Sequence, residues 1–149
     1  MKKTILILAV FTMIVGAAIS ASAQSEEAVK AILSAYKNAN EKLDTTGTGK
    51  LFVKNSTVVE SGSLEGNYQN YVQHHLGPEL SEFKSFKFNN YKIEVQMIGD
   101  VAITTESYEY VIVAKKDGAV FKRKGVATSV LVNKNGVWQI VNTHSSSRK

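Results

Sequence analysis

The first regular pattern of apolar positions along the chain predicts a helix between Ser25 and Leu43. Apolar side chains recur there three and four residues apart, a spacing that gathers them on one face of an α-helix. They are Ala28, Val29, Ile32, Leu33 and Tyr36. Ser25 is a suitable N-cap, and the two glutamates after it place negative charge where the helix dipole favours it. We expect this helix to end near Asp44, before the loop-like sequence TTGTG.

An extended segment and a second helix are predicted next. Residues 50–61 are rich in β-forming side chains, but Lys54–Ser56 interrupts them and indicates a turn or a bulge. A second helical stripe follows, made of aromatic and apolar side chains and one histidine. Its members are Tyr68, Tyr71, Val72, His75 and Leu76. We expect Gly77-Pro78 to interrupt this helix, with a short further turn of helix at residues 79–83.

The rest of the chain has the two-residue alternation that is typical of half-buried strands. The turn signals Gly99-Asp100, Asp117-Gly118 and Asn135-Gly136 divide it. The strands expected between them cover residues 91–97, 101–114, 119–132 and 137–145. Helices followed by an antiparallel meander define an α+β fold. We expect a curved, cone-shaped sheet whose apolar face is covered by the N-terminal helices and which encloses a pocket.

The N-terminal residues have the layout of a secretory signal peptide. Lysines at positions 2 and 3 precede an apolar run from Ile5 to Ile19, which ends at the small-x-small triplet Ala21-Ser22-Ala23. The run is shorter than the ~20 apolar residues that span a bilayer. We therefore expect residues 1–23 to be a signal peptide cleaved after Ala23, and residues 24–149 to form one domain. The protein is predicted to be periplasmic or secreted, with no stable membrane span after cleavage.

Composition excludes several classes of function. The chain of 149 residues has no cysteine, which excludes a disulfide framework, a cysteine-based zinc site and a thiol nucleophile. The formal net charge is +5, and loss of the two N-terminal lysines would leave +3. A surplus this small does not by itself indicate nucleic-acid binding. The densest basic run, Lys122–Lys124, lies in a predicted strand, where we expect it to be solvated and to protect a sheet edge. No nucleic-acid partner is predicted.

The order of these elements and the closing strand resemble the nuclear transport factor two-like superfamily. Residues 136–146, GVWQIVNTHSS, carry most of the resemblance, and Tyr71–Leu80 and Gly125–Val132 support it. Within the superfamily, the chain is similar to small SnoaL-like and ketosteroid-isomerase-like proteins, particularly exported ones of unknown function. The resemblance covers residues 25–148, so residues 24–149 are expected to be one SnoaL-like domain with a cystatin-like sheet. This fold hosts isomerases, cyclases, dehydratases and binding modules.

The resemblance implies a pocket between the concave face of the sheet and the helices. Steroid isomerases of the superfamily use a catalytic Asp as base and a Tyr with a protonated Asp as oxyanion donors. That trio has no counterpart here, because Asp100 and Asp117 fall in predicted turns and no acid is expected beside Tyr108 and Tyr110. Isomerase activity of that kind is therefore not predicted. The strand at 101–114 is partly apolar on both faces, so a homodimer through the sheet is expected, as in many superfamily members.

The histidines His75 and His144 are the candidate catalytic residues. His75 lies on the stripe of the second predicted helix, and His144 has the parity of Ile140 on the last strand, so the two imidazoles converge in the pocket if that parity faces the concave side of the sheet. Together with Glu79, they are also weak candidates for a zinc or iron site, and Glu60 is a further candidate acid. The alternative is a structural role, in which the imidazoles bond to each other or to a tyrosine. No cofactor is predicted.

Aromatic side chains and one amide are the candidate ligand-binding residues. They are Tyr68, Tyr71, Tyr108, Tyr110 and Asn142. The alternative for the tyrosines is an ordinary core position. Three functions remain open: an exported protein that binds a small apolar or aromatic ligand, a pocket enzyme of the isomerase, lyase or hydrolase kind, and an envelope protein that interacts through its sheet. Ligand binding is favoured, because the sequence has no nucleophile motif, no phosphate-binding loop and no acid pair at helical spacing that faces a pocket.

Overall fold

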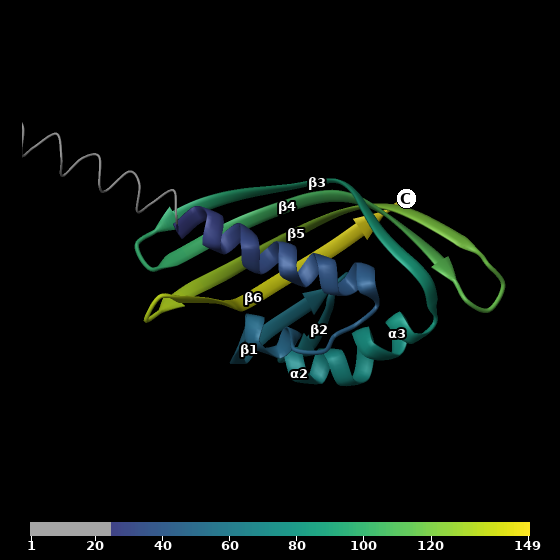
Figure 1. The fold of residues 1–149 in the computed structure, drawn as a ribbon, viewed down its shortest axis with the longest axis horizontal. Helices are drawn as coiled ribbons and strands as arrows, with labels where there is room; N and C mark the ends of the chain where they lie inside the picture. Colours follow the sequence, from purple (N-terminus) through teal and green to yellow (C-terminus); the bar gives the residue numbers. More distant parts are fainter. Residues whose placement is uncertain (1–24) are drawn as a thin grey trace, which may run out of the picture.

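The computed structural model describes residues 25–149, so the predicted signal peptide lies outside the described residues. One helix, residues 25–42, lies across the inner face of a curved sheet (Figure 1). The sheet has six strands in the order β2-β1-β6-β5-β4-β3. The fold is therefore α+β with a curved sheet, as the sequence predicts. None of the helices in the described part of the chain is long and apolar enough to cross a membrane.

Four long strands form the predicted antiparallel meander. They are β3 (Phe83–Ile98), β4 (Val101–Ala114), β5 (Val120–Lys134) and β6 (Val137–Arg148). The last turn shows why the prediction succeeds: Asn135 and Gly136 have φ values of 55° and 83°, which a two-residue hairpin of the primed type needs. Both β3 and β6 extend further than their alternation predicts.

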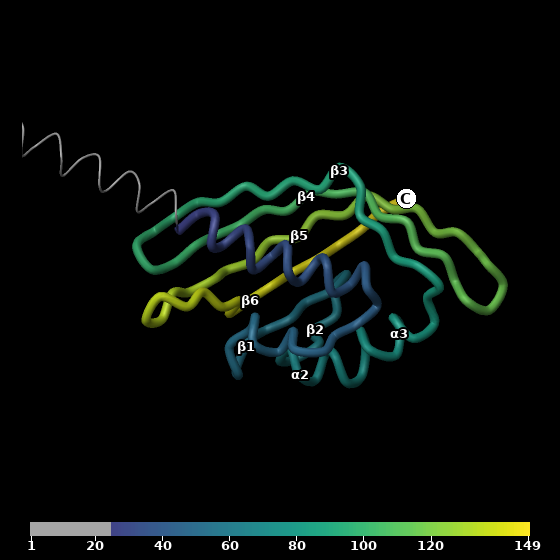
Figure 2. Tube along the Cα trace, in the orientation of Figure 1, coloured from purple at the N-terminus to yellow at the C-terminus, as the bar shows by residue number. Residues whose placement is uncertain are grey.

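A second, shorter group of strands extends the sheet beyond β6. After a helical turn, η1 (Thr48–Leu51), the chain enters β1 (Phe52–Glu60), which pairs with β6 in parallel and with β2 (Ser63–Gly66) in antiparallel orientation. Figure 2 shows β1 beside β6, although their first residues, Phe52 and Val137, are 85 positions apart in the sequence. The register of β1 against β6 shifts between Phe52 and Thr57. This agrees with the irregularity predicted at residues 54–56.

The second helix is not interrupted at Gly77-Pro78, so that prediction is wrong. Consecutive segments α2 (Tyr68–Tyr71), η2 (Val72–Leu76) and α3 (Gly77–Ser81) form one continuous helical stretch. The π-helical turn η2 makes this possible, because the N–H of Gly77 bonds to the carbonyl of Val72, five residues earlier. A Cβ at Gly77 would lie 2.6 Å from that carbonyl oxygen, so the close approach requires glycine.

The core lies between helix 25–42, the second helical stretch and the inner face of the sheet. Val29 and Leu33 of the first helix are fully buried, as are Leu131 and Ile140 of the sheet. Trp138 of β6 is also buried and belongs to this core. These contacts fix the first helix over the sheet and leave a space between them.

The end of helix 25–42 is tied to β3 by a hydrogen bond. The backbone N–H of Phe88 donates to the Glu41 carboxylate at 2.8 Å, and the same carboxylate pairs with Lys37 at 2.8 Å. Just beyond Phe88 the register of β3 against β4 shifts between Asn89 and Lys92. The last turns of the helix are thus held at the bend of β3, and this contact positions their side chains at the space inside the sheet.

Candidate functional site

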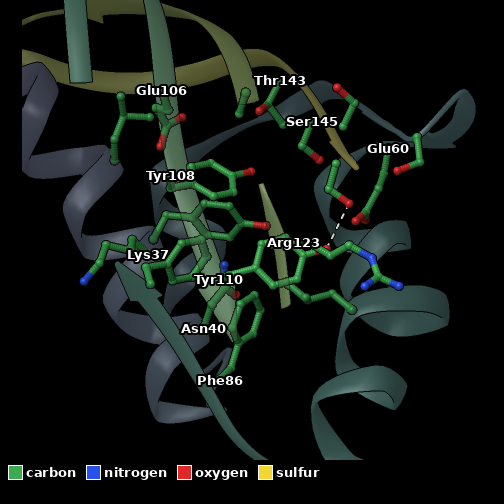
Figure 3. A pocket seen from close by; sticks show the side chains of 18 of the residues that line it. Lys37, Asn40, Glu60, Phe86, Glu106, Tyr108, Tyr110, Arg123, Thr143 and Ser145 are labelled. Atoms are coloured by element: carbon green, nitrogen blue, oxygen red, sulfur yellow. Dashed lines mark hydrogen bonds between the residues drawn. The ribbon is translucent and has the colours of Figure 1, made fainter. Parts of the chain in front are cut away.

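A cavity of about 380 Å³ lies between helix 25–42, the second helical stretch and the inner face of the sheet (Figure 3). This volume lies within the range of small-molecule sites. Nine aromatic side chains contribute to its wall: Tyr36, Tyr71, Phe83, Phe86, Phe88, Tyr91, Tyr108, Tyr110 and Phe121. Polar side chains from both helical stretches and from the sheet interrupt this wall. The cavity is therefore mainly aromatic, with a few polar groups at fixed places.

Three of the four tyrosines predicted to bind a ligand line this cavity. They are Tyr71, Tyr108 and Tyr110. The fourth, Tyr68, is in the core instead: its ring stacks on Phe52 with the centroids 3.7 Å apart, and its hydroxyl donates to a threonine of η1 at 2.8 Å. The helical stripe predicted that Tyr68 faces inward, which is correct, but its end of the helix packs on β1 rather than on the cavity.

The ring of Tyr108 occupies space that a glycine provides. Tyr108 on β4 is the register partner of Gly125 on β5. A Cβ at Gly125 would lie 2.1 Å from Cε2 of the tyrosine ring. The other side of the ring meets Phe88 edge to face, with centroids 5.1 Å apart. Glycine at this position therefore determines where the Tyr108 ring lies on the cavity wall.

A buried acid, Glu106, lies on the same face of β4 as Tyr108 and Tyr110. It lines the cavity and accepts a hydrogen bond from the Tyr91 hydroxyl. Burial raises the pKa of Glu106, and the hydrogen bond from Tyr91 opposes this only in part. The expectation that no acid lies beside the two strand tyrosines is therefore wrong. The sequence does indicate this neighbour: Glu106, Tyr108 and Tyr110 are two residues apart along β4, and alternate residues of a strand share a face.

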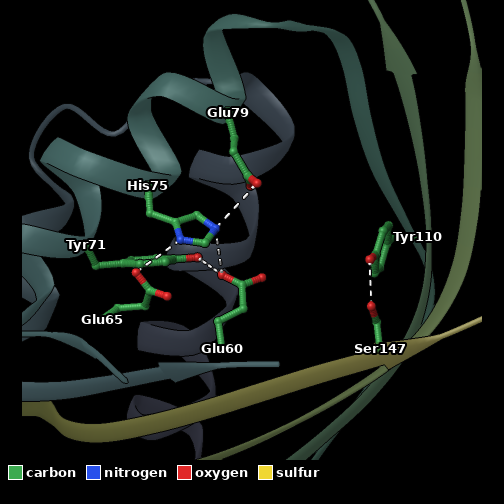
Figure 4. Close-up of polar contacts among 7 residues, drawn as sticks. All are labelled: Glu60, Glu65, Tyr71, His75, Glu79, Tyr110 and Ser147. Atoms are coloured by element: carbon green, nitrogen blue, oxygen red, sulfur yellow. Dashed lines mark hydrogen bonds and ion pairs between the residues drawn. The ribbon is translucent and has the colours of Figure 1, made fainter. Parts of the chain in front are cut away.

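His75 forms a cluster with three carboxylates, shown in Figure 4. Its Nδ1 lies 3.1 Å from Glu65, and its Nε2 lies 3.4 Å from Glu79 and 3.7 Å from Glu60. Tyr71 donates a hydrogen bond of 2.5 Å to Glu60 from the other side. Glu60 and Glu79 line the cavity, whereas His75 itself is set behind them. His75 and Glu79, four residues apart, are in contact because the helical stretch continues through Gly77-Pro78, where the sequence analysis expects an interruption.

These carboxylates favour the protonated form of His75. Burial alone would lower the pKa of His75, but the hydrogen bond with Glu65 and the charges of Glu79 and Glu60 outweigh it and raise this pKa. Burial also raises the pKa of Glu79, and the charge of His75 opposes that change. An imidazole with both nitrogens against carboxylates is best described as an imidazolium that holds the acidic side chains in place.

The His75 cluster predicts how stability depends on pH. Because the pKa of His75 is raised by folding, its contribution is complete below the ordinary histidine value of ~6.5 and is lost as the pH rises through the folded-state value. We expect the free energy of unfolding, measured with urea, to fall as the pH rises above about 6.5. His75→Gln should flatten this fall, and the control His144→Gln should retain it. An equal fall in His75→Gln would assign the pH dependence to other groups.

His144 and Asn142 do not line the cavity, so the predicted convergence of His144 with His75 is wrong. β6 has a bulge at Val141, which has no register partner on β5. A bulge reverses the parity of the residues that follow it. Thr143 therefore faces the cavity, whereas His144 is exposed on the other face.

Arg123 lines the cavity, although the sequence predicts a solvated basic run at Lys122–Lys124. The two lysines are exposed as expected, but the residue between them points to the opposite face of the strand. The guanidinium of Arg123 donates to the backbone carbonyl of Lys122 at 2.9 Å. Strand alternation predicts this too, because Arg123 lies on the opposite face of the strand from its two lysine neighbours.

The structure gives no support to the weak metal candidates. Within residues 25–149, no group of three or more His, Cys, Asp or Glu side chains is arranged to hold a metal ion. His144 is remote from the cluster of His75 and Glu79, and the two nitrogens of His75 face carboxylates. A metal ligand must offer a neutral imidazole nitrogen, which this environment disfavours.

The chain belongs to the SnoaL-like domain family, which matches residues 29–148. Its structure is similar to that of a nuclear transport factor 2-like superfamily protein from Salmonella enterica serovar Typhimurium, with a TM-score of 0.77 and 16% identity over 86% of this chain and 94% of that chain. The resemblance read from the closing strand is therefore confirmed. No curated protein matches the chain.

Other structures with this fold include an enzyme and a protein without assigned function. A hexachlorocyclohexane dehydrochlorinase from Novosphingobium barchaimii has a TM-score of 0.72 and 11% identity over 85% of this chain and 88% of that chain. An uncharacterised protein with a cystatin-like fold from Caulobacter vibrioides has a TM-score of 0.68 and 15% identity over 85% of this chain and 91% of that chain. At such identities, the likeness establishes the fold alone.

Proposed function

We propose that the chain binds a small aromatic or apolar molecule in the cavity between helix 25–42 and the sheet. The observation that carries this proposal is the wall of nine aromatic side chains around about 380 Å³. Ring contacts such as Phe86 on Phe88, stacked with centroids 4.7 Å apart, support the wall in one shape before a ligand enters. The few polar groups would orient the ligand, while the rings supply most of the contact area.

Tyr108→Ala tests this proposal. We expect the unaltered chain to bind 2-naphthol saturably and the variant to bind it about tenfold more weakly, because it lacks one ring of the wall. The measurement is a titration that follows the fluorescence of 2-naphthol. Val137→Ala removes apolar atoms from an exposed residue of the same sheet and should keep the affinity within about twofold. Equal affinities for Tyr108→Ala and the unaltered chain would place the binding elsewhere.

Export and dimerisation are further parts of this proposal. The layout of residues 1–23 supports cleavage after Ala23 and a periplasmic or secreted location. The exposed apolar side chains of Ile103 and Val126 on β4 and β5 support a homodimer through the sheet. Native mass spectrometry of the exported protein tests both points. A chain that begins at Gln24 and has the mass of a dimer is expected; an intact N-terminus or a strict monomer would contradict the corresponding part.

A second candidate function is proton-transfer catalysis on the bound molecule. The observation that favours it is that carboxyl groups in unlike surroundings, among them Glu106 and Glu60, line one cavity. Burial raises the pKa of Glu106, which shifts this group toward the protonated form that can donate a proton. Glu60 is backed by the Tyr71 hydroxyl and the His75 imidazole, an arrangement that suits a carboxylate able to accept one. In this version His75 acts through Glu60, and His144 has no role.

Hydrogen exchange at carbon tests this candidate directly. The chain would accelerate the exchange of the α-hydrogens of 2-tetralone for deuterium, measured by NMR. Glu60→Gln and Glu106→Gln would each slow that exchange by about 100-fold, within the range that general acid–base groups contribute. His144→Gln is the matched control and should retain the full rate. Exchange no faster than in buffer alone would count against catalysis and leave ligand binding as the function.

A further inference from the structure

Asn40 carries a buried hydrogen-bond acceptor at the wall of the cavity. It lies near the end of helix 25–42, is 7% exposed and contributes to the cavity wall, where Figure 3 labels it. Its side-chain oxygen, Oδ1, has no hydrogen-bond partner among the described residues. Buried polar atoms in folded proteins nearly always have a partner, since an unpaired one loses its hydration without compensation. This oxygen therefore requires an explanation.

Several other polar groups of the cavity wall pair with one another. Hydroxyls pair with hydroxyls on the sheet, and tyrosine hydroxyls donate to the carboxylates of Glu60 and Glu106. These pairs are Ser129–Thr143, Tyr110–Ser147, Tyr71–Glu60 and Tyr91–Glu106. Within residues 25–149, Asn40 Oδ1 is the one buried side-chain nitrogen or oxygen that lacks a partner. The unpaired acceptor is thus a particular property of this position and does not reflect a generally unsatisfied wall.

Tyr36 lies one turn before Asn40 on the same helix, and both residues line the cavity. Burial raises the pKa of Tyr36 well above its ordinary value, and the neighbouring Asn40 side chain acts in the opposite direction. The two side chains therefore lie near one another at the cavity wall, and Asn40 Oδ1 is the atom left without a partner.

We propose that Asn40 Oδ1 receives a hydrogen bond from the ligand, and that the ligand is a hydroxylated aromatic compound. The proposal rests on ligand binding in this cavity. A hydroxyl fits the site because it can donate to Asn40 and also accept a hydrogen bond from the Tyr36 hydroxyl beside it. An ammonium group donates but cannot accept, and a methyl ether accepts but cannot donate. The rings hold the aromatic body of the ligand, and Asn40 selects its hydroxyl.

The test compares 2-naphthol with 2-methoxynaphthalene, which lacks only the donor hydrogen. Affinities are measured by fluorescence titration on the full chain and on Asn40→Leu. We expect the unaltered chain to prefer 2-naphthol by about tenfold, because the ether leaves Oδ1 unpaired. In Asn40→Leu the ratio of the two affinities should fall to about one. The affinity of this variant for 2-methoxynaphthalene should equal or exceed that of the unaltered chain. Tyr36→Phe is the matched control: it removes a neighbouring hydroxyl, keeps Oδ1, and should retain a preference of at least about threefold.

Each possible outcome decides the proposal. A preference that survives in Asn40→Leu, or equal affinities of the unaltered chain for the two probes, would overturn the role of Asn40 while leaving the aromatic cavity as a binding site. Failure of both probes to bind the unaltered chain would overturn the proposed function and this inference with it. Thermal unfolding verifies that the variant is folded. If Asn40→Leu does not fold, Asn40→Ser takes its place, and the same loss of preference is expected.

Discussion

Replacement of Gly125 by alanine is expected to destabilise the chain and to weaken ligand binding together. The added Cβ would lie 2.1 Å from the Tyr108 ring, a distance that real contacts do not reach, so the ring must swing away from the sheet. Overpacking of this kind costs about 1–3 kcal/mol. A ring displaced from its place on the wall also enters the cavity, so we expect the affinity for 2-naphthol to fall by more than about tenfold. Urea unfolding and fluorescence titration measure the two effects.

Two further variants isolate the clash as the cause. Gly49→Ala is the matched control, because a Cβ at Gly49 meets no atom within 4 Å and the backbone there has an ordinary φ. It should change the free energy of unfolding by less than about 0.5 kcal/mol. In a Tyr108→Ala background the clash cannot occur, so Gly125→Ala should then cost close to nothing. A similar cost in both backgrounds would show that the strand backbone, and not the tyrosine ring, requires glycine.

Elements with strong periodicity and local turn signals are the ones that the sequence predicts well. β4 has its predicted bounds, Val101–Ala114, because Gly99-Asp100 and Asp117-Gly118 define the turns on both sides. The parallel pairing of β1 with β6 has no such local signal, since it joins strands that are far apart in the chain. The continuity of the second helix through Gly77-Pro78 was also hidden, because it depends on a π-helical turn that relieves the usual conflict with proline.

The residues of the candidate site also divide into those that a sequence pattern can place and those that it cannot. The contact of His75 with Glu79 needs a spacing of four residues on an uninterrupted helix, so the expected break at Gly77-Pro78 hid a contact that the spacing alone would indicate. The place of His144 depends on one unpaired residue at the β6 bulge, which no alternation pattern reveals. Glu106 was accessible to sequence reasoning through its parity with Tyr108. So was Asn40, which lies seven residues after Leu33 on the buried stripe of the first helix.

The first helix closes the cavity, and Leu33 is the residue on which this depends most. Leu33 is 1% exposed and contributes both to the core and to the cavity wall. Leu33→Ala removes buried methyl groups and leaves a space that its neighbours refill only in part. Substitutions of this kind cost about 2–5 kcal/mol. We expect urea unfolding to show a loss in this range, and hydrogen exchange to show faster opening of residues 25–42 than of β4 and β5.

A leucine-to-alanine substitution at an exposed site is the matched control. It shows whether the cost comes from lost packing in the core or from the change of residue type alone. Leu64 on β2 is 73% exposed, so Leu64→Ala should change the free energy of unfolding by less than about 0.5 kcal/mol. If Leu33→Ala costs no more than Leu64→Ala, the helix is not held by this contact, and the cavity would not need it for closure. If the cost is large and 2-naphthol binding falls with it, the helix over the sheet is part of the binding site. Docking of helix 25–42 would then set both the stability of the fold and the shape of its aromatic cavity.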